Sequence, residues 1–334
     1  MAVDMEPREF NYGALFMGVA RRSPWETPMN LRSECLRTPI EAFLSNLKRA
    51  STFASMPAEI AYRVRRDQLL SDCATFNTTG RVEPNLRQFL DGEPSDDYKT
   101  EFEKLAREHF SKTKTEDNRL NLTLGLGVGY IERMLDESLP MRESMDATFE
   151  AVILQSWTAF ECLTGDLWVS GVDNEPGEVV SRLIYERRRL KNPDDNVRPE
   201  TVYRTGINPK THYGSFLRAI KSVAFQTLTD IKKYYGIAFG EEFTDLFDAI
   251  DAGYVEVLAA FRNAITHNSG RADRHFISQI ARFRDFSEIR ENDRLQLEGG
   301  LVLRLRNVAS ALGRGLIEQM DELLTPKITP ADNP

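Results

Sequence analysis

An all-α fold is the class that this 334-residue sequence predicts. Apolar side chains recur at helical spacing through long stretches, most clearly at 144–169 and 241–270. Helix start signals are also present, since the tetrapeptide Thr-Pro-Ile-Glu at 38–41 combines an N-cap, a first-turn Pro and a capping-box Glu. We expect a helical bundle at 141–325, preceded by a smaller helical region at 1–140.

The first 140 residues predict an irregular arm followed by helices. Residues 1–37 hold three Pro residues among scattered aromatic side chains, which favours an irregular or extended conformation. An exposed loop is expected at 91–97, which contains a Gly, a Pro and four acidic residues. The helices expected from capping signals and apolar spacing are 38–50, a second that Pro57 opens, and 98–111.

A glycine-rich run, LGLGVGY at 124–130, lies inside the stretch 117–139. A dinucleotide-binding loop needs a preceding strand and two residues before its third Gly, and a P-loop needs Gly-Lys followed by Ser or Thr. The run meets neither requirement. We therefore interpret it as a place of close helix packing or a bend.

Residues 141–325 predict the longer helices and one loop-rich insertion, with Pro140 as the boundary. The insertion, 170–212, holds four Pro residues and the basic run SRLIYERRRLK, so we expect a short helix flanked by loops. LQLEGGLVL at 295–303 predicts a small hairpin or a turn before the final helix. The helices expected from apolar spacing are 144–169, 213–235, 241–270, 274–283 and a last one that ends near Leu324.

The end of the helix expected at 241–270 brings together residue types that perform chemistry. Arg262 and Asn263 precede His267 and Asn268, and Gly270 then terminates the helix. An imidazole with a pKa of about 6.5 transfers protons at neutral pH, and a guanidinium binds phosphate through two parallel hydrogen bonds. In metal-free RNA cleavage the 2′-hydroxyl attacks the adjacent phosphate, a His is base or acid, and an Arg stabilises the phosphorane. That reaction requires no cofactor.

The run Arg262-Asn263-Ala264-Ile265-Thr266-His267 resembles the signature of the HEPN (higher eukaryotes and prokaryotes nucleotide-binding) superfamily: Arg, a polar residue, three to five spacers and His. Asn268 and Gly270 resemble residues that commonly flank that signature. The resemblance covers 141–324 and implies an up-down helical bundle that forms a homodimer in which two motifs face each other. It further implies a metal-independent endoribonuclease, such as a toxin or defence effector restrained by an antitoxin or a defence-system partner.

Two functions are therefore open at this stage. In the first, the chain cleaves RNA, with Arg262 on the scissile phosphate, His267 as acid or base, and Asn263 positioning either of them. In the second, the bundle is a non-catalytic dimerisation module that binds nucleotides or proteins, as some relatives in that superfamily do.

Helical geometry limits how Arg262 and His267 act together. Five residues along a continuous helix place two side chains about 140° apart around the axis and about 7.5 Å apart along it. Either the helix ends between them, or the partner groups come from a second copy of the chain. A structural alternative is that Arg262 is a solvated cation near the helix terminus and His267 caps the helix. Glu161 flanks the apolar stripe at 144–169, where it either orients Arg262 or His267 through an ion pair or is a surface carboxylate.

Charge distribution restricts where RNA is expected to bind. A formal net charge of −8 argues against indiscriminate nucleic-acid binding, because attraction to phosphate supplies the sequence-independent part of that affinity. Positive charge gathers locally, since residues 262–314 hold ten Arg and no Lys against six acidic residues. Basic residues that either contact an RNA backbone or form a solvated helix face are Arg187, Arg188, Arg189, Arg204, Lys210 and Arg271.

The remaining composition favours a cytoplasmic protein without a metal site. Cys35, Cys73 and Cys162 are too few and too widely spaced for a disulfide framework or a metal knuckle, so we expect a reducing compartment and no metal or cofactor. No run approaches the roughly 18 apolar residues of a membrane span. The start, MAVDMEPREF, lacks the basic and apolar regions of a targeting signal, so no membrane partner is expected.

Overall fold

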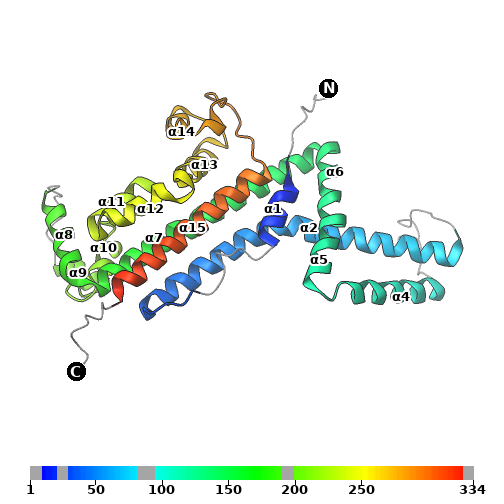
Figure 1. Ribbon diagram of the computed structural model, residues 1–334, viewed down its shortest axis with the longest axis horizontal. Coiled ribbons are helices and arrows are strands. Elements are labelled where there is room, and N and C mark those ends of the chain that lie inside the picture. Colours follow the sequence, from blue (N-terminus) through cyan, green and yellow to red (C-terminus); the bar gives the residue numbers. More distant parts are fainter. Residues whose placement is uncertain (1–9, 21–28, 81–94, 190–198, 326–334) are drawn as a thin grey trace. The chain divides into compact units, whose positions relative to one another are not determined.

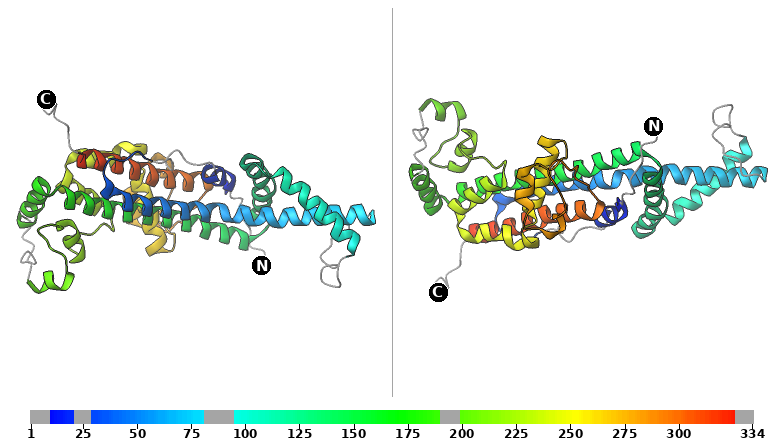
Figure 2. Two further views of the ribbon diagram at one scale, coloured as in Figure 1. Left: turned by 90° about the horizontal axis from the view of Figure 1, so that it is seen from below. Right: turned by 90° about the horizontal axis from the view of Figure 1, so that it is seen from above.

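The fold is all-α, as predicted (Figures 1 and 2). The computed structural model describes residues 10–20, 29–80, 95–189 and 199–325, and within these residues there are helices and no strand. The chain divides into two compact units, each assembled from segments that are distant in sequence. The first unit comprises Met1–Arg22, Ser51–Phe149 and Leu297–Leu303, and the second comprises Ser23–Ala50, Glu150–Gln296 and Arg304–Pro334.

The first unit is built from helices of very different length. They are α1 (Tyr12–Ala20), the part of α2 (Arg37–Thr79) that follows Ala50, α4 (Asp96–Lys112), α5 (Glu116–Leu122), a π-helical turn (Thr123–Val128), α6 (Gly129–Glu137), α7 (Leu139–Asn174) up to Phe149 and α15 (Gly299–Leu324) up to Leu303. The helix expected at 98–111 is confirmed by α4. The prediction of an irregular arm at 1–37 is wrong for residues 12–20, which form α1 with Tyr12, Leu15 and Phe16 buried. Residues 1–9 and 21–28 of that arm, and most of the expected loop at 91–97, lie outside the described residues.

A single helix, α2, replaces the two that Pro57 was expected to separate. Proline has no N–H and its ring clashes with the carbonyl four residues earlier, so it opens the hydrogen-bond ladder of a helix. The hydroxyl of Tyr12 enters this opening: it donates to the Ala54 carbonyl at 2.7 Å and accepts from the Ala58 N–H at 3.1 Å. These two groups would otherwise form the helix's own bond from residue 58 to residue 54. Helix α2 continues because α1 supplies the missing partner.

The glycine-rich run packs against the same part of α2. A Cβ at Gly127 would overlap the carbonyl oxygen of Ala58 and would lie 3.2 Å from Cβ of Tyr62. Only a glycine allows the backbones to approach this closely. The π-helical turn at Thr123–Val128 provides the local widening. The interpretation of the run as close helix packing or a bend is confirmed, and no phosphate loop is present there.

The second unit packs its helices around aromatic side chains. Trp168 donates from Nε1 to the Tyr234 carbonyl at 3.0 Å, and the buried hydroxyl of Tyr235 donates to the Thr164 carbonyl at 2.8 Å. A Cβ at Gly313 would overlap the ring of Phe43, so this glycine permits the close approach of two helices. Three long helices contribute part of their length to this unit: α2 up to Ala50, α7 (Leu139–Asn174) from Glu150 on, and α15 (Gly299–Leu324) from Arg304 on. The other helices of the unit are α8 (Pro176–Arg189), α9 (Pro199–Thr205), α10 (Tyr213–Ala219), α11 (Leu228–Phe239), α12 (Glu241–Ala249), α13 (Val255–Asn268) and α14 (Arg274–Ile280).

The helix expected at 241–270 is in fact broken in two. Between α12 and α13, Asp251 and Ala252 have φ values of 47° and 51°, and Gly253 follows at 77°. This left-handed turn is held by Arg304, which donates from Nε to Asp251 at 2.9 Å and lies 3.4 Å from the ring centroid of Tyr254. The apolar spacing continues through the break, which is why the sequence predicted one helix.

Three further helix boundaries differ from the prediction. The helix expected at 213–235 is divided into α10 and α11, because Thr227 caps α11 and its Oγ1 accepts from the Asp230 N–H at 3.1 Å. No hairpin forms at 295–303, where α15 begins at Gly299; an isolated bridge pairs Arg271 with Arg294. The helix expected at 144–169 is longer at both ends: α7 begins at Leu139, before Pro140, and ends at Asn174.

Candidate active site

A cleft of about 540 Å³ opens in the second unit beside the C-terminal half of α13. Arg262, Asn263, His267 and Asn268 all line it, so the structure brings the four residues of the predicted motif to one place. The other lining residues come from the start of α11 and from α14: Gln226, Thr227, Asp273, His275, Phe276 and Gln279, with Ala260 and Ala264 from α13 itself.

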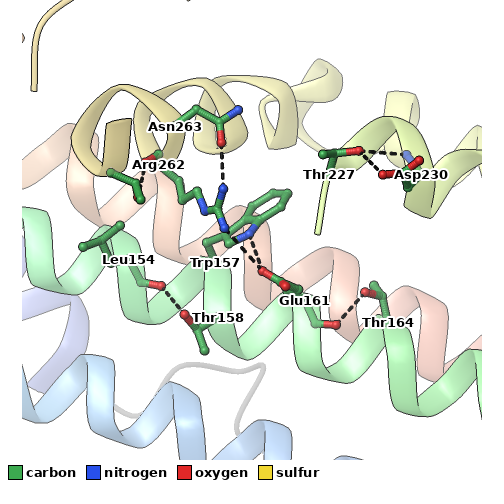
Figure 3. Close-up of polar contacts among 10 residues, drawn as sticks. Leu154, Trp157, Thr158, Glu161, Thr164, Thr227, Asp230, Arg262 and Asn263 are labelled. Atoms are coloured by element: carbon green, nitrogen blue, oxygen red, sulfur yellow. Dashed lines mark hydrogen bonds and ion pairs between the residues drawn. The ribbon is translucent and has the colours of Figure 1, made fainter. Parts of the chain in front are cut away.

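Arg262 is held from three sides (Figure 3). Its Nη2 lies 3.8 Å from Oε2 of Glu161, and its Nη1 donates to Oδ1 of Asn263 at 2.9 Å. The guanidinium carbon lies 5.8 Å from the ring centroid of Trp157 on α7. With 22% of the side chain exposed, Arg262 is fixed in position and still reaches the solvent of the cleft. Trp157 lies within the apolar stripe predicted at 144–169, and its contact with Arg262 was not predicted.

Glu161 is the ion-pair partner that the sequence offered as one of two possibilities. It accepts from Nε1 of Trp157 at 2.8 Å, one helical turn earlier on α7. Burial raises the pKa of Glu161 above its ordinary value, and the hydrogen bond from Trp157 and the charge of Arg262 act in the opposite direction. The carboxylate thus orients the guanidinium although burial makes its ionised form less favourable.

His267 lies on the exposed side of the cleft. Helix α13 runs without interruption to Asn268, so of the two alternatives left open by helical geometry, the one in which the helix ends between Arg262 and His267 is wrong. It ends just after the motif, where Ser269 and Gly270 take φ values of 52° and 73° and the Gly270 N–H donates to the Ala264 carbonyl at 3.0 Å. The side chain of His267 has no hydrogen-bond partner within the described residues, which leaves both ring nitrogens available.

Asn268 connects the two helices that border the cleft. Its Nδ2 donates to Oδ2 of Asp273 at 2.6 Å, and Oδ1 of Asp273 accepts from the Phe276 N–H at 2.7 Å as the cap of α14. These hydrogen bonds lower the pKa of Asp273, so it is a carboxylate at neutral pH. Asp273 and His275 were not among the predicted site residues. The signal available in the sequence was a capping Asp and a second His only eight positions after His267.

Of the residues proposed to hold an RNA backbone, Arg204, Lys210 and Arg271 do not line the cleft. Arg204 on α9 and Lys210 after it are exposed, and Arg271 is exposed with its Nη1 donating to the Asn292 carbonyl at 3.0 Å. The side chains of Arg187, Arg188 and Arg189 lie outside the described residues, although their backbone ends α8. In both figures of the whole chain, α8 and α9 lie at one end of the second unit, away from α14 (Figures 1 and 2).

Neither composition nor similarity assigns this cleft further. Within the described residues, no group of three or more His, Cys, Asp and Glu side chains is arranged to hold a metal ion. None of the described helices has both the length and the apolar character that crossing a membrane requires. Comparison with protein-family models, with curated proteins and with solved structures found no match to this chain.

Proposed function

We propose that this chain is a metal-independent endoribonuclease whose active site is the cleft beside α13. Arg262 holds the scissile phosphate, His267 transfers a proton, and Asn263 positions the guanidinium. The resemblance of the run at 262–267 to the HEPN signature supports the proposal, as does its place at the end of a buried helix in an all-α unit. Pairing of two copies as a homodimer, with a toxin or defence role, belongs to the same proposal.

The observation that carries the proposal is the fixed, partly exposed guanidinium of Arg262 in the cleft that His267 also borders. An arginine that is already oriented loses little side-chain freedom when it binds a phosphate. A guanidinium stabilises the charge that develops on the phosphorane more than the charge of the ground state, which is what lowers a barrier. Glu161 thus acts as a positioning residue for Arg262.

The chemistry is completed by the substrate itself. The RNA 2′-hydroxyl loses a proton and its oxygen attacks the adjacent phosphorus, while the bond from phosphorus to the 5′-oxygen breaks and that oxygen gains a proton. The products are a 2′,3′-cyclic phosphate and a free 5′-hydroxyl. An imidazole is the side chain suited to these transfers at neutral pH.

A second function is supported by the same ion pair. Glu161 reduces the net positive charge beside Arg262, and the whole chain carries a charge of −8. Both weaken attraction to an RNA backbone, which leaves binding of a protein or a small nucleotide without cleavage as the second function. In that case the cleft binds a ligand reversibly and does not cleave it.

The test is incubation of the purified chain with total RNA in chelator, compared with the variants His267→Ala and His212→Ala. His267→Ala is expected to lower cleavage by about a hundredfold or more, with nearly unchanged thermal stability because the imidazole is exposed. His212 is exposed on the same unit but does not line the cleft, so His212→Ala is the matched control and should cleave normally. Equal cleavage by all three proteins would refute the proposal, and RNA binding without any cleavage would favour the second function.

A further inference from the structure

A second imidazole borders the cleft on the opposite side of the turn from His267. His275 lies in the first turn of α14, and its position relative to α13 is fixed by the hydrogen bond between Asn268 and Asp273. Below this turn, Phe276 packs edge-to-face on Phe261 with ring centroids 5.2 Å apart, and both rings are buried. The two helices therefore hold His267 and His275 in one rigid corner of a single chain.

The same face of α14 carries a polar group that points to a ligand. Gln279 lies one turn after His275 and also lines the cleft. Its Oε1 is buried and has no hydrogen-bond partner within the described residues. A buried acceptor without a partner costs free energy, and a bound hydroxyl or amine removes that cost. The cleft is thus equipped for a polar occupant on its α14 side as well as at Arg262.

RNA cleavage by the 2′-hydroxyl needs two proton transfers at two different oxygens. One imidazole serves both only by changing its protonation state and position between them. Two imidazoles, one neutral and one protonated, carry out both proton transfers in a single reaction step, because the ordinary pKa of an imidazole lies close to neutral pH.

We propose that His267 and His275 of one protomer form the acid and base pair of this cleft. The inference rests on the proposed ribonuclease function and goes beyond it, since it places both proton-transfer groups in one chain. Neutral His267 accepts the proton of the 2′-hydroxyl as the bond from that oxygen to phosphorus forms. Protonated His275 donates to the 5′-oxygen as the bond from phosphorus to that oxygen breaks.

The charged groups around the cleft favour this assignment. Asp273, a carboxylate two positions before His275, lies on the α14 side of the cleft, and its pKa is lowered in part by the charge of His275. Arg262 lines the cleft on the α13 side with His267, so the group that takes the proton of the 2′-hydroxyl borders the same side as the group that holds the phosphate. Arg274, the neighbour of His275, is paired with Glu291 at 3.1 Å.

The deciding experiment uses the full chain and a single-stranded RNA oligonucleotide in chelator, in two forms. One form is unmodified, and in the other a sulfur atom replaces the 5′-oxygen at one linkage. A thiolate leaves without protonation because the pKa of a thiol, about 8.5, is far below that of an alcohol. On unmodified RNA, His267→Ala and His275→Ala should each lower cleavage by about a hundredfold or more. On the sulfur-containing RNA, His275→Ala should regain most of the wild-type rate and His267→Ala should not.

The pH dependence gives an independent readout of the same roles. Wild-type cleavage of unmodified RNA should rise and then fall with increasing pH, since the base must be neutral and the acid protonated. Cleavage of the sulfur-containing RNA by His275→Ala should keep only the rising limb. A merely structural role of His275 would lower the rate and leave the shape of the profile unchanged.

Mixing the two inactive variants tests whether one chain supplies both groups. Equal amounts of His267→Ala and His275→Ala should remain inactive, because no protomer then holds both imidazoles. Restored cleavage would show that the groups come from different copies and would overturn the inference. Normal cleavage of unmodified RNA by His275→Ala would also overturn it while leaving the ribonuclease proposal in place. A wild-type chain that cleaves no RNA would overturn both.

Discussion

The hydroxyl of Tyr12 is predicted to stabilise the first unit by repairing helix α2 beside Pro57. Tyr12→Phe removes the donor to Ala54 and the acceptor for Ala58 while keeping the buried ring. Each hydrogen bond contributes on the order of 0.5–1.5 kcal/mol, so the variant should lose about 1–3 kcal/mol of unfolding free energy. Tyr185→Phe, at an exposed tyrosine, is the control and should change that free energy by less than about 0.5 kcal/mol.

The contribution of the Tyr12 hydroxyl should depend on Pro57, and a double-mutant cycle tests this dependence. In a Pro57→Ala background the helix can close its own bond between Ala58 and Ala54, so the loss caused by Tyr12→Phe should shrink by about 1 kcal/mol. Urea denaturation of the four proteins, followed by far-ultraviolet circular dichroism, gives the coupling free energy. Additive effects, within about 0.3–0.5 kcal/mol, would refute the idea that the hydroxyl replaces a helical hydrogen bond.

Two further predictions concern the second unit. Burial raises the folded-state pKa of Glu161 above its unfolded value, so its contribution to stability is greatest below the unfolded pKa and is lost as pH rises through the folded pKa. Glu161→Gln retains an acceptor for Trp157, and its stability relative to wild type should therefore increase as the pH rises from acidic to neutral. RNA cleavage by this variant should fall, because Arg262 is no longer oriented. A stability difference that does not change with pH would contradict this prediction. Ala252→Gly should stabilise the chain by about 1 kcal/mol, because it replaces an alanine held in the left-handed conformation. Ala311→Gly, inside α15, is the control and should destabilise the chain by a similar amount. If thermal unfolding showed stability changes of the same sign for both variants, the turn would not be strained.

Much of the fold followed from residues that act locally. The apolar stripe of α7 and the Gly270 terminator each depend on neighbours within one or two turns, and the structure has helices where these signals lie. The capping pattern at 38–41 falls in a helix as well, but α2 begins at Arg37, so Thr38 is not its N-cap. Thr227 shows that one such signal was overlooked, because its capping pattern with Asp230 divides α10 from α11.

The breaks that were mispredicted depend on partners far along the chain. Pro57 would end an isolated helix, and α2 continues through it because Tyr12, 45 positions earlier, supplies hydrogen bonds. Ala252 would continue an isolated helix, and the left-handed turn persists because Arg304 binds Asp251 from α15. Propensity and periodicity carry no information on such contacts, so these elements could not be predicted from the sequence.

The candidate site shows the same division. Spacing and residue type were enough to select Arg262, Asn263 and His267, and all three border one cleft. The presence of Trp157 and His275 beside them depends on how α7 and α14 pack on α13, which no local pattern encodes. The basic residues expected to bind an RNA backbone were selected by charge alone, and those whose side chains the structure describes, Arg204, Lys210 and Arg271, do not line the cleft.

The central claim is that the cleft around Arg262 and His267 uses the substrate's own 2′-hydroxyl to cut RNA. The most direct measurement uses a DNA oligonucleotide that contains one ribonucleotide, incubated with the purified chain in chelator and followed by mass spectrometry. We expect a single cut on the 3′ side of the ribonucleotide, a 2′,3′-cyclic phosphate on the upstream product, and loss of that product with His267→Ala. Cleavage at deoxyribonucleotide positions, or the same product from the His267 variant, would contradict it.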